Sequence, residues 1–193
     1  IIGNPPYQVM DGGAGASAKP IYQLFIQQAM KLNPKYISMI TPSRWFAGGK
    51  GLDDFRKAML KDKRIKVIHD YPNASEVFPS IEIKGGVNYF LWDKEYKGDC
   101  LIRTYENGVC VSALKRPLKE NNADVFIRYN EAIPILRKIQ SFNEKSFSEL
   151  MSSAKPFGLR TYFKGESEPF EGAIKIYVNG GVGYIKKEGV LKN

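Results

Sequence analysis

Two consecutive prolines end the apolar run at the start of the chain, which reads Ile-Ile-Gly-Asn-Pro-Pro-Tyr over residues 1–7. Proline fixes φ and has no N–H, so the backbone after the run stays extended and presents carbonyl oxygens without neighbouring donors. The Asn4 side-chain oxygen and the Pro5 carbonyl are suited to accept both hydrogens of an exocyclic amine, while the Tyr7 ring offers a face to a base. The segment predicts a site for a planar amine such as an extruded adenine, although an ordinary strand exit closed by prolines would have the same sequence.

The next hundred residues alternate strand and helix patterns, which predicts an α/β fold. With 193 residues, 43% hydrophobic and 25% charged, the chain has the composition of a globular protein with one sizeable core and part of a second. Each expected helix has an apolar stripe that would face the sheet. The expected elements are a helix that opens at Pro20 and buries Ile21, Leu24, Phe25, Ala29 and Leu32, a strand over 36–41, a helix over 52–61 that buries Leu52, Phe55, Met59 and Leu60, and a strand over 65–69.

The Asn-Pro-Pro-Tyr motif and the α/β pattern give residues 1 to about 112 a clear resemblance to a known family. This part resembles the C-terminal half of a Rossmann-like adenine-N6 DNA methyltransferase, of the kind found in restriction-modification systems. The resemblance implies S-adenosylmethionine as methyl donor and assigns catalytic roles to Asn4, Pro5 and Tyr7 by direct match. It also implies a target-base pocket with Pro6 and with Phe78, which belongs to a Val-Phe segment before a strand that closes the sheet as an antiparallel hairpin.

The chemistry implied by this resemblance needs neither a metal nor a nucleophilic side chain. Accepting both N–H bonds would favour the pyramidal, more nucleophilic amine and so stabilise the transition state. Cys100 and Cys110 lack metal-ligand spacing and are expected to be ordinary strand residues of a protein in a reducing compartment. The single histidine, His69, precedes Asp70, but neighbours on a strand point to opposite faces, so a structural histidine is expected.

Two loops are candidates for a place beside the site. Thr-Pro-Ser-Arg-Trp-Phe over residues 41–46 follows a strand at the end where open α/β sheets place ligands. Arg44 is a candidate phosphate contact and Trp45 a candidate pocket residue, with a solvated arginine and a core indole as the alternatives. Residues 12–17, Gly-Gly-Ala-Gly-Ala-Ser, match neither the P-loop nor the dinucleotide fingerprint and predict a loop beside the site.

A second module is expected from residue 115, where a basic stretch with a proline ends the alternation of strands and helices. Residues 1–114 would be the C-terminal part of a methyltransferase catalytic domain, and 115–193 the start of a smaller α+β target-recognition domain. Helices are expected near 133–139 and 147–150. Basic and aromatic residues then alternate, as on a DNA-facing surface, although a solvated face over a small core fits too; they are Lys155, Arg160 and Lys164 with Phe157, Tyr162 and Phe163.

Charge and the chain ends set further expectations. The formal net charge is +9, from 29 Lys and Arg against 20 Asp and Glu, which suits a polyanion-binding surface and favours double-stranded DNA as partner. No stretch is long or apolar enough to cross a bilayer, and the two cysteines, without metal-ligand spacing or a disulfide framework, make a reducing cytoplasm the expected compartment. The chain starts at Ile1 without a basic leader, so it is expected to be cut from something longer.

The family's S-adenosylmethionine loop and first three strands would all precede Ile1. The missing N-terminal part of the same protein is therefore an expected partner, and the chain alone is expected to be nearly inactive. Its first strand would then lie at an artificial sheet edge, which invites association with another chain.

Two other functions remain open on the sequence. The chain could be a DNA-binding or specificity module without catalysis, or a methyltransferase that acts on a glutamine amide or an RNA guanine amine with the same motif. The long basic extension after residue 115 favours DNA. Asn4, where cytosine-N4 enzymes more often carry serine, favours adenine.

Overall fold

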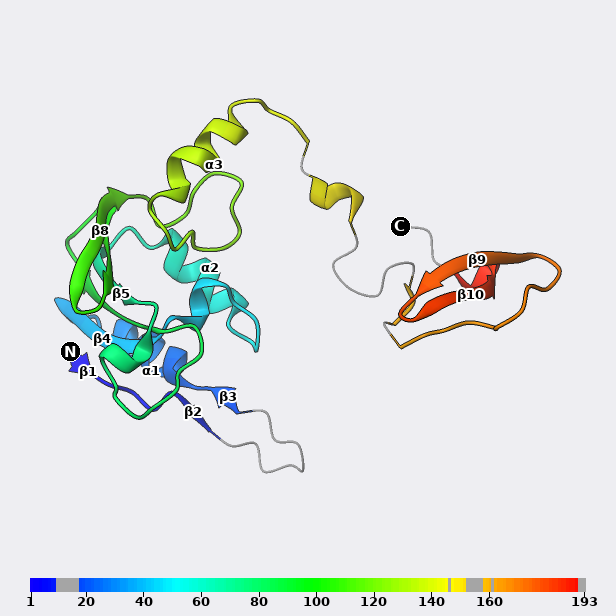
Figure 1. Ribbon diagram of the computed structural model, residues 1–193. Coiled ribbons are helices and arrows are strands. Elements are labelled where there is room, and N and C mark those ends of the chain that lie inside the picture. The colour runs from blue at the N-terminus through cyan, green and yellow to red at the C-terminus, as the bar shows by residue number, and fades with distance from the viewer. Residues whose placement is uncertain (10–17, 146, 152–157, 161, 191–193) are drawn as a thin grey trace. The chain divides into compact units, whose positions relative to one another are not determined.

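The computed structural model describes residues 1–9, 18–145, 147–151, 158–160 and 162–190 (Figure 1). Contacts between residues divide the chain into two compact units, Ile1–Arg137 and Lys138–Asn193. Each unit is described by itself below.

One six-stranded sheet forms the centre of the N-terminal unit. Its strands are β1 Ile2–Gly3, β4 Tyr36–Pro42, β5 Ile65–Tyr71, β6 Val87–Asp93, β7 Cys100–Glu106 and β8 Val109–Arg116. They lie in the order β1-β4-β6-β5-β7-β8. β1 is parallel to β4 and β5 is parallel to β7, whereas β6 is antiparallel to both β4 and β5. The predicted α/β class and the predicted strands over 36–41 and 65–69 are confirmed, and the hairpin strand β6 lies inside the sheet.

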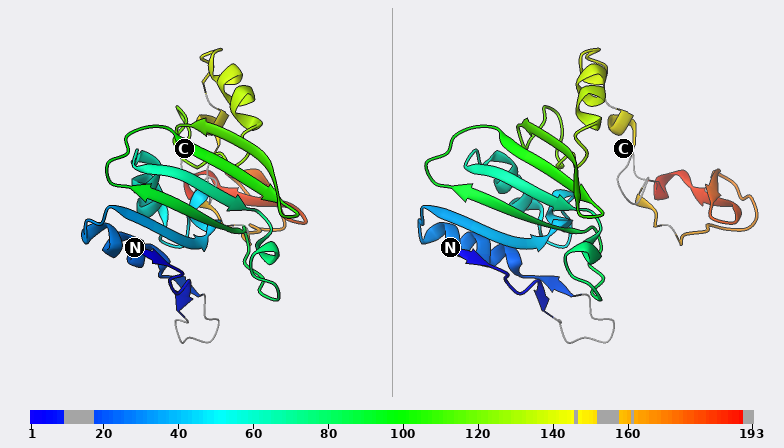
Figure 2. Two further views of the ribbon diagram at one scale, coloured as in Figure 1. Left: turned by 90° about the vertical axis from the view of Figure 1, so that its left-hand side faces the viewer. Right: turned by 60° about the vertical axis from the view of Figure 1, so that its left-hand side comes forward.

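Two helices cover one face of the sheet, α1 Tyr22–Lys31 and α2 Asp53–Lys61 (Figure 2). The α2 stripe is as predicted, because all four of its apolar residues are buried; they are Leu52, Phe55, Met59 and Leu60. Two aspartates in the first turn and a lysine in the last complement the helix dipole.

The α1 stripe differs from the prediction. Tyr22, Ile26 and Ala29 are buried, whereas Leu24, Phe25 and Leu32 are 56%, 45% and 68% exposed. Both sets follow helical spacing and meet at Ala29, so the periodicity alone allows either face to turn inward. Packing selects the face that begins with Tyr22, whose ring stands edge-on to Phe55 of α2 at 6.3 Å between centroids.

The core between helices and sheet is aromatic. Trp45 is fully buried between Phe46 and Phe55, with ring centroids 4.7 and 5.9 Å away. Trp92 on β6 is also fully buried, and its indole N–H donates to Asp62 at 3.0 Å. Buried aromatic rings of this size each contribute a large apolar area to the core.

The segment after β8 belongs to the N-terminal unit by its packing. Leu118, Phe126 and Ile133 are buried, and the Phe126 N–H donates to the Phe46 carbonyl at 3.0 Å. The compact unit thus extends past the boundary expected at residue 115 and ends at Arg137. The basic stretch at 115–119 is no linker, because Arg116 is 2% exposed and lies within the sheet.

The C-terminal unit contains a β-hairpin of β9 Ala173–Val178 and β10 Gly181–Lys186. Its single-turn helices are η3 Phe147–Leu150 and η5 Lys187–Gly189. The longer α3, Ala132–Gln140, begins in the N-terminal unit, so both helices expected in this region are present. Within the described residues, no helix is long and apolar enough to span a membrane.

Candidate functional site

The Asn-Pro-Pro-Tyr motif forms the connection between β1 and the short strand β2, Gln8–Val9, which pairs with β3, Lys19–Pro20. Because β1 and β4 are parallel, the motif and the loop after β4 leave the sheet at the same edge. Asn4 is exposed, and among the described residues its side chain forms no hydrogen bond; Pro5 is buried. Within this part of the chain, the carboxamide oxygen of Asn4 is available to accept a hydrogen bond from a ligand.

Tyr7 is held by its backbone and its ring. Its carbonyl accepts from the Ile21 N–H at 3.1 Å, and its ring packs on the core and stands edge-on to Phe78 at 6.3 Å. Its hydroxyl is buried without a hydrogen-bond partner in the described part of the chain. Burial raises the pKa of Tyr7 to about 12, so the phenol stays neutral at physiological pH.

A cavity of about 390 Å³ opens beside Tyr7. Its walls come from three stretches that are distant in sequence: the motif and start of α1, the loop after β4, and the segment before β6. The lining residues are Tyr7, Gln8, Pro20, Tyr22, Pro42, Arg44, Lys50, Ile81, Glu82, Ile83 and Lys84. Tyr7 and Arg44 are thus brought together as expected, with Phe78 against Tyr7, whereas Asn4, Pro5 and Pro6 do not line this cavity.

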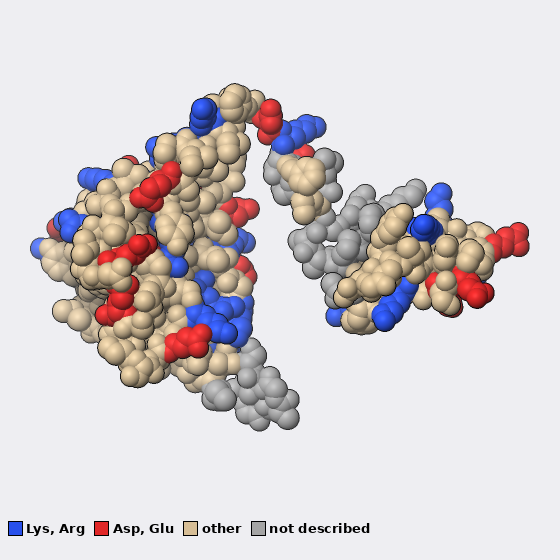
Figure 3. All heavy atoms as spheres, viewed as in Figure 1, with Lys and Arg blue, Asp and Glu red and all other residues tan. Residues whose placement is uncertain are grey.

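Three cations reach the cavity. Arg44 is exposed on the single-turn helix η1, Ser43–Phe46, and Lys50 is exposed in the glycine-rich loop that follows. Lys84 joins them from the segment before β6, where Glu82 also lines the wall. Figure 3 shows Lys and Arg atoms gathered on the N-terminal unit over the loop between β4 and α2. Such a rim suits an anionic ligand.

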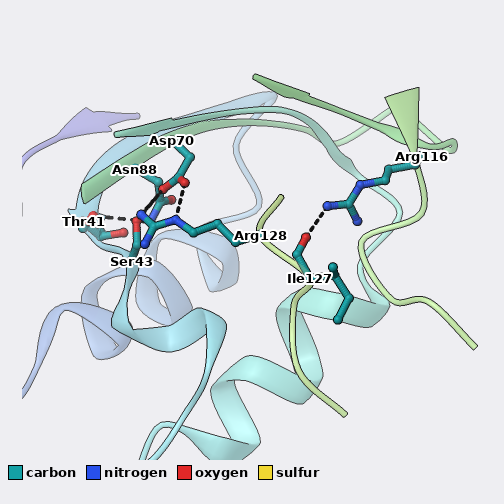
Figure 4. A network of polar contacts seen from close by, with 7 residues as sticks. All are labelled: Thr41, Ser43, Asp70, Asn88, Arg116, Ile127 and Arg128. Atoms are coloured by element: carbon teal, nitrogen blue, oxygen red, sulfur yellow. Dashed lines mark hydrogen bonds and ion pairs between the residues drawn. The ribbon is translucent and has the colours of Figure 1, made fainter. Parts of the chain in front are cut away.

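A buried polar network underlies the same edge of the sheet (Figure 4). Asp70, at the end of β5, is fully buried and accepts from the Ser43 hydroxyl at 2.9 Å. The Arg128 guanidinium donates to both oxygens of Asp70, at 2.5 and 2.8 Å. Asn88 of β6 donates to the Ser43 Oγ at 3.2 Å. A carboxylate this deeply buried needs such partners.

The His69-Asp70 pair is divided between the two faces of the sheet, as strand geometry predicts. His69 stacks on Tyr89 at 4.4 Å between centroids, and its Nδ1 lies 2.9 Å from the Tyr105 hydroxyl. Desolvation and nearby Arg103 lower the pKa of His69. Asp70 contacts Arg128 on the other face, so the two residues do not form a relay.

The remaining predicted residues lie elsewhere. Trp45 is a core residue and does not line the cavity. Arg160 and Lys164 are exposed in the C-terminal unit. Lys155 and the loop at 12–17 lie outside the described residues. Cys100 is buried in β7 and Cys110 is exposed in β8, both as free thiols, and the described residues hold no cluster of three metal-ligating side chains.

Several residues of this region were missed by reasoning from the sequence. Tyr22 was not recognised because the apolar stripe of α1 was placed on another face. Lys50 and Lys84 lie next to glycines in loops that follow or precede strands, which is the signal that could have identified them. Asp70 and Arg128 are 58 residues apart, and no local pattern marks their pairing.

A larger cavity of about 740 Å³ lies at the other end of the strands. It is lined by the C-terminal end of α2 and by residues that precede β5 and β7, among them Lys63, Arg64 and Lys97. Asp62 in its wall is already bound by Arg64 at 2.8 Å and by the Trp92 indole. Ligands of open α/β sheets bind at the carboxyl ends of the strands, so the smaller cavity is the better candidate site.

Comparison with known proteins connects this site with one family. Residues 1–78 match the family Eco57I restriction-modification methylase. Over 107 residues, 54% of this chain and 25% of the relative, the chain is 42% identical to a Mycoplasma pneumoniae protein named as an uncharacterized adenine-specific methylase. The matched part thus spans about a quarter of that relative's length.

Solved structures give weaker likenesses. One is the methyltransferase subunit of a type I restriction-modification system from Streptococcus thermophilus, with a TM-score of 0.38 and 12% identity over 75% of this chain and 32% of that chain. Another, from work on complex assembly in a type I R-M system, has a TM-score of 0.42 and 13% identity over 78% of this chain and 32% of that chain. At these scores the likenesses support no statement about this chain. The two sequence matches, by contrast, confirm the resemblance to adenine-specific restriction-modification methylases that the Asn-Pro-Pro-Tyr motif predicts.

Proposed function

We propose that the protein in its full natural length methylates the exocyclic N6 of adenine in double-stranded DNA, as the modification enzyme of a restriction-modification system. One observation carries the proposal: within the described residues the Asn4 carboxamide forms no hydrogen bond, and it lies at the carboxyl end of a parallel strand, three residues before an aromatic ring that borders a cationic cavity. Within the chain, the family match covers this stretch.

The residues of the motif would act on the amino group. The Asn4 oxygen and the Pro5 carbonyl accept its two N–H bonds, which leaves the nitrogen lone pair available. The Tyr7 ring offers its face to the extruded base, and Phe78 fixes the ring from its edge. S-adenosylmethionine would supply the methyl group. The neutral phenol of Tyr7 adds no charge beside an uncharged base.

The cations at the cavity would bind the DNA backbone. Arg44, Lys50 and Lys84 lie around the cavity that Tyr7 borders, where the phosphates flanking an extruded nucleotide would pass. Pro6 stays a proposed pocket residue. Lys155, Arg160 and Lys164 stay proposed contacts of a target-recognition domain in the C-terminal part of the chain.

The cationic rim favours DNA over the glutamine amide of a protein as substrate. A protein amide presents no phosphates for three cations to bind, whereas a nucleotide presents them on both sides of the base. The same rim fits an RNA guanine amine, so the substrate must be tested directly.

The test is identification of the methylated product. The full-length protein is incubated with methyl-labelled S-adenosylmethionine and, separately, with double-stranded DNA, structured RNA and a protein extract, and the products are digested and analysed by mass spectrometry. The proposal predicts N6-methyladenine from DNA alone. N4-methylcytosine, methylguanine in RNA or methylglutamine would each contradict it, and DNA binding without methylation would favour a specificity module.

A further inference from the structure

The two facing walls of the Tyr7 cavity are connected through Ser43. The residues on either side of Ser43 line one wall, while Ser43 itself is buried. Its N–H donates to the Gly86 carbonyl at 2.9 Å, and the Gly86 N–H donates to the carbonyl of Ile83 at 3.0 Å. Ile83 lines the other wall. The position of Ser43 therefore sets how the two walls face each other.

The Ser43 side chain is oriented by a carboxylate that is itself fixed. Asp70 is fully buried and receives the Ser43 hydroxyl on Oδ1. The Arg128 guanidinium holds both Asp70 oxygens at 2.5 and 2.8 Å, and its side chain is only 20% exposed (Figure 4). A bidentate pair of this kind fixes the carboxylate plane as well as its charge.

Arg128 is in turn held by its own surroundings. Arg116, 2% exposed at the end of β8, donates to the backbone carbonyl of Ile127 and to the side-chain Oδ1 of Asn130, so residues on both sides of Arg128 are bound to the sheet. The Arg128 guanidinium also lies 5.7 Å from the centroid of the Phe46 ring. Gly86 leaves room for it: a Cβ at that position would lie 2.8 Å from Arg128 Nη2.

We propose that Arg128 is a positioning residue for the proposed methyl transfer. Through Asp70 and Ser43, it holds the two walls of the Tyr7 cavity in their relative positions. The inference rests on the proposed function. Within the described residues, Arg128 forms its ion pair with Asp70 and not with a residue that lines the cavity. It therefore acts through the buried carboxylate. Catalysis depends on the placement of the reacting groups, and a misplacement of about 1 Å caused by a distant substitution can lower the rate by about 10²-fold.

The experiment compares two arginines of the same segment in the full-length protein. Arg128→Lys keeps the charge but loses the fork that holds Asp70. Arg137→Lys is the matched control, because Arg137 makes a similar bidentate pair with Glu120, at 3.0 and 2.9 Å, away from the cavity. The kcat and the KM values for S-adenosylmethionine and DNA are measured per folded molecule, with thermal unfolding recorded for each variant. We expect kcat to fall about tenfold in Arg128→Lys, with both KM values and the control's kcat changed less than about twofold.

A second pair of measurements keeps the inference testable if Arg128→Lys does not fold. Ser43→Ala removes only the hydroxyl and is expected to lower kcat about tenfold as well. Where both variants fold, the kcat of the variant that carries both substitutions should be little lower than that of either single variant, because Arg128 and Ser43 both act through Asp70. Equal kcat values in Arg128→Lys and Arg137→Lys, or an unchanged kcat in Ser43→Ala, would overturn the positioning role. A full-length protein that methylates no DNA before any substitution would instead overturn the proposed function.

Discussion

The ring of Phe78 stands edge-on to the ring of Tyr7, with centroids 6.3 Å apart and planes inclined at 74°. An edge-on contact of this kind fixes the orientation of the Tyr7 ring and does not cover both faces of the ring. Phe78 precedes the segment that forms one cavity wall, so the pair joins the motif to that wall.

Replacing Tyr7 separates the role of its ring from that of its hydroxyl. Tyr7→Phe keeps the ring and removes a buried hydroxyl without a partner in the described residues, so we expect unchanged or slightly higher stability and nearly full activity. Tyr7→Ala should weaken DNA binding by about 1–3 kcal/mol because the stacking surface is removed. DNA titrations check the binding prediction, and methylation kinetics with thermal unfolding check the prediction for Tyr7→Phe. A Tyr7→Phe variant that binds DNA as weakly as Tyr7→Ala would contradict the stacking role.

Gly86 should resist substitution more than its neighbour Gly85. Both have positive φ, 81° and 90°, so both substitutions to Ala carry backbone strain of about 1 kcal/mol. At Gly86 a Cβ would also lie 2.6 Å from the Pro72 carbonyl and closer still to that of Tyr71, whereas at Gly85 the space is open. Chemical denaturation should show Gly86→Ala destabilised by at least about 1 kcal/mol more than Gly85→Ala, and equal losses would contradict the packing described.

The cations of the cavity should contribute to the salt dependence of DNA binding. Replacing Arg44 or Lys50 with Gln should reduce the slope of log K against log salt by about 0.9 for each phosphate that the side chain neutralises. Lys35→Gln is the control, because Lys35 precedes β4 at the opposite end of the strands. Titrations of labelled DNA at several salt concentrations measure the slopes. A slope that changes as much in the control as in the two variants would show that these cations do not bind phosphate.

His69 should make stability depend on pH. Its pKa in the folded protein lies below the ordinary 6.5, because desolvation and Arg103 disfavour the charged ring. The folded state therefore binds fewer protons, and the contribution of neutral His69 is complete above pH 6.5 and is lost as pH falls toward the folded pKa. Urea unfolding from pH 7.5 to 5 should show a steeper loss for the unsubstituted protein than for His69→Phe; parallel curves would contradict this.

The buried face was predicted correctly for α2 and incorrectly for α1, and the difference has a physical reason. The α2 sequence has one apolar stripe, so its buried face could be predicted. The α1 sequence has two, and only the position of the sheet and of Phe55 decides that Tyr22 turns inward. The motif could be interpreted as a candidate site because proline and asparagine act locally through their own backbone and side chain.

The polar network was beyond such reasoning. In the sequence, Asp70 is an ordinary residue of a strand and Arg128 is one charge in a basic segment. The two residues are 58 positions apart, and they pair only when β5 packs against the segment that follows β8. The extent of the first compact unit could not be predicted for the same reason. A basic stretch with a proline resembles a linker, but burial of Arg116 against Asn130 and Phe126 makes it part of the first unit.

The most direct test of the account is the effect of Asn4 on methyl transfer by the full-length protein. Asn4→Ala removes the acceptor from an exposed side chain that forms no hydrogen bond within the described residues, so folding should be unaffected. We predict that N6-methyladenine formation falls by about 10²–10³-fold, while DNA affinity changes less than about twofold. Methylation by the Asn4→Ala protein at the unsubstituted rate would contradict the assignment of the Asn-Pro-Pro-Tyr segment as the catalytic site.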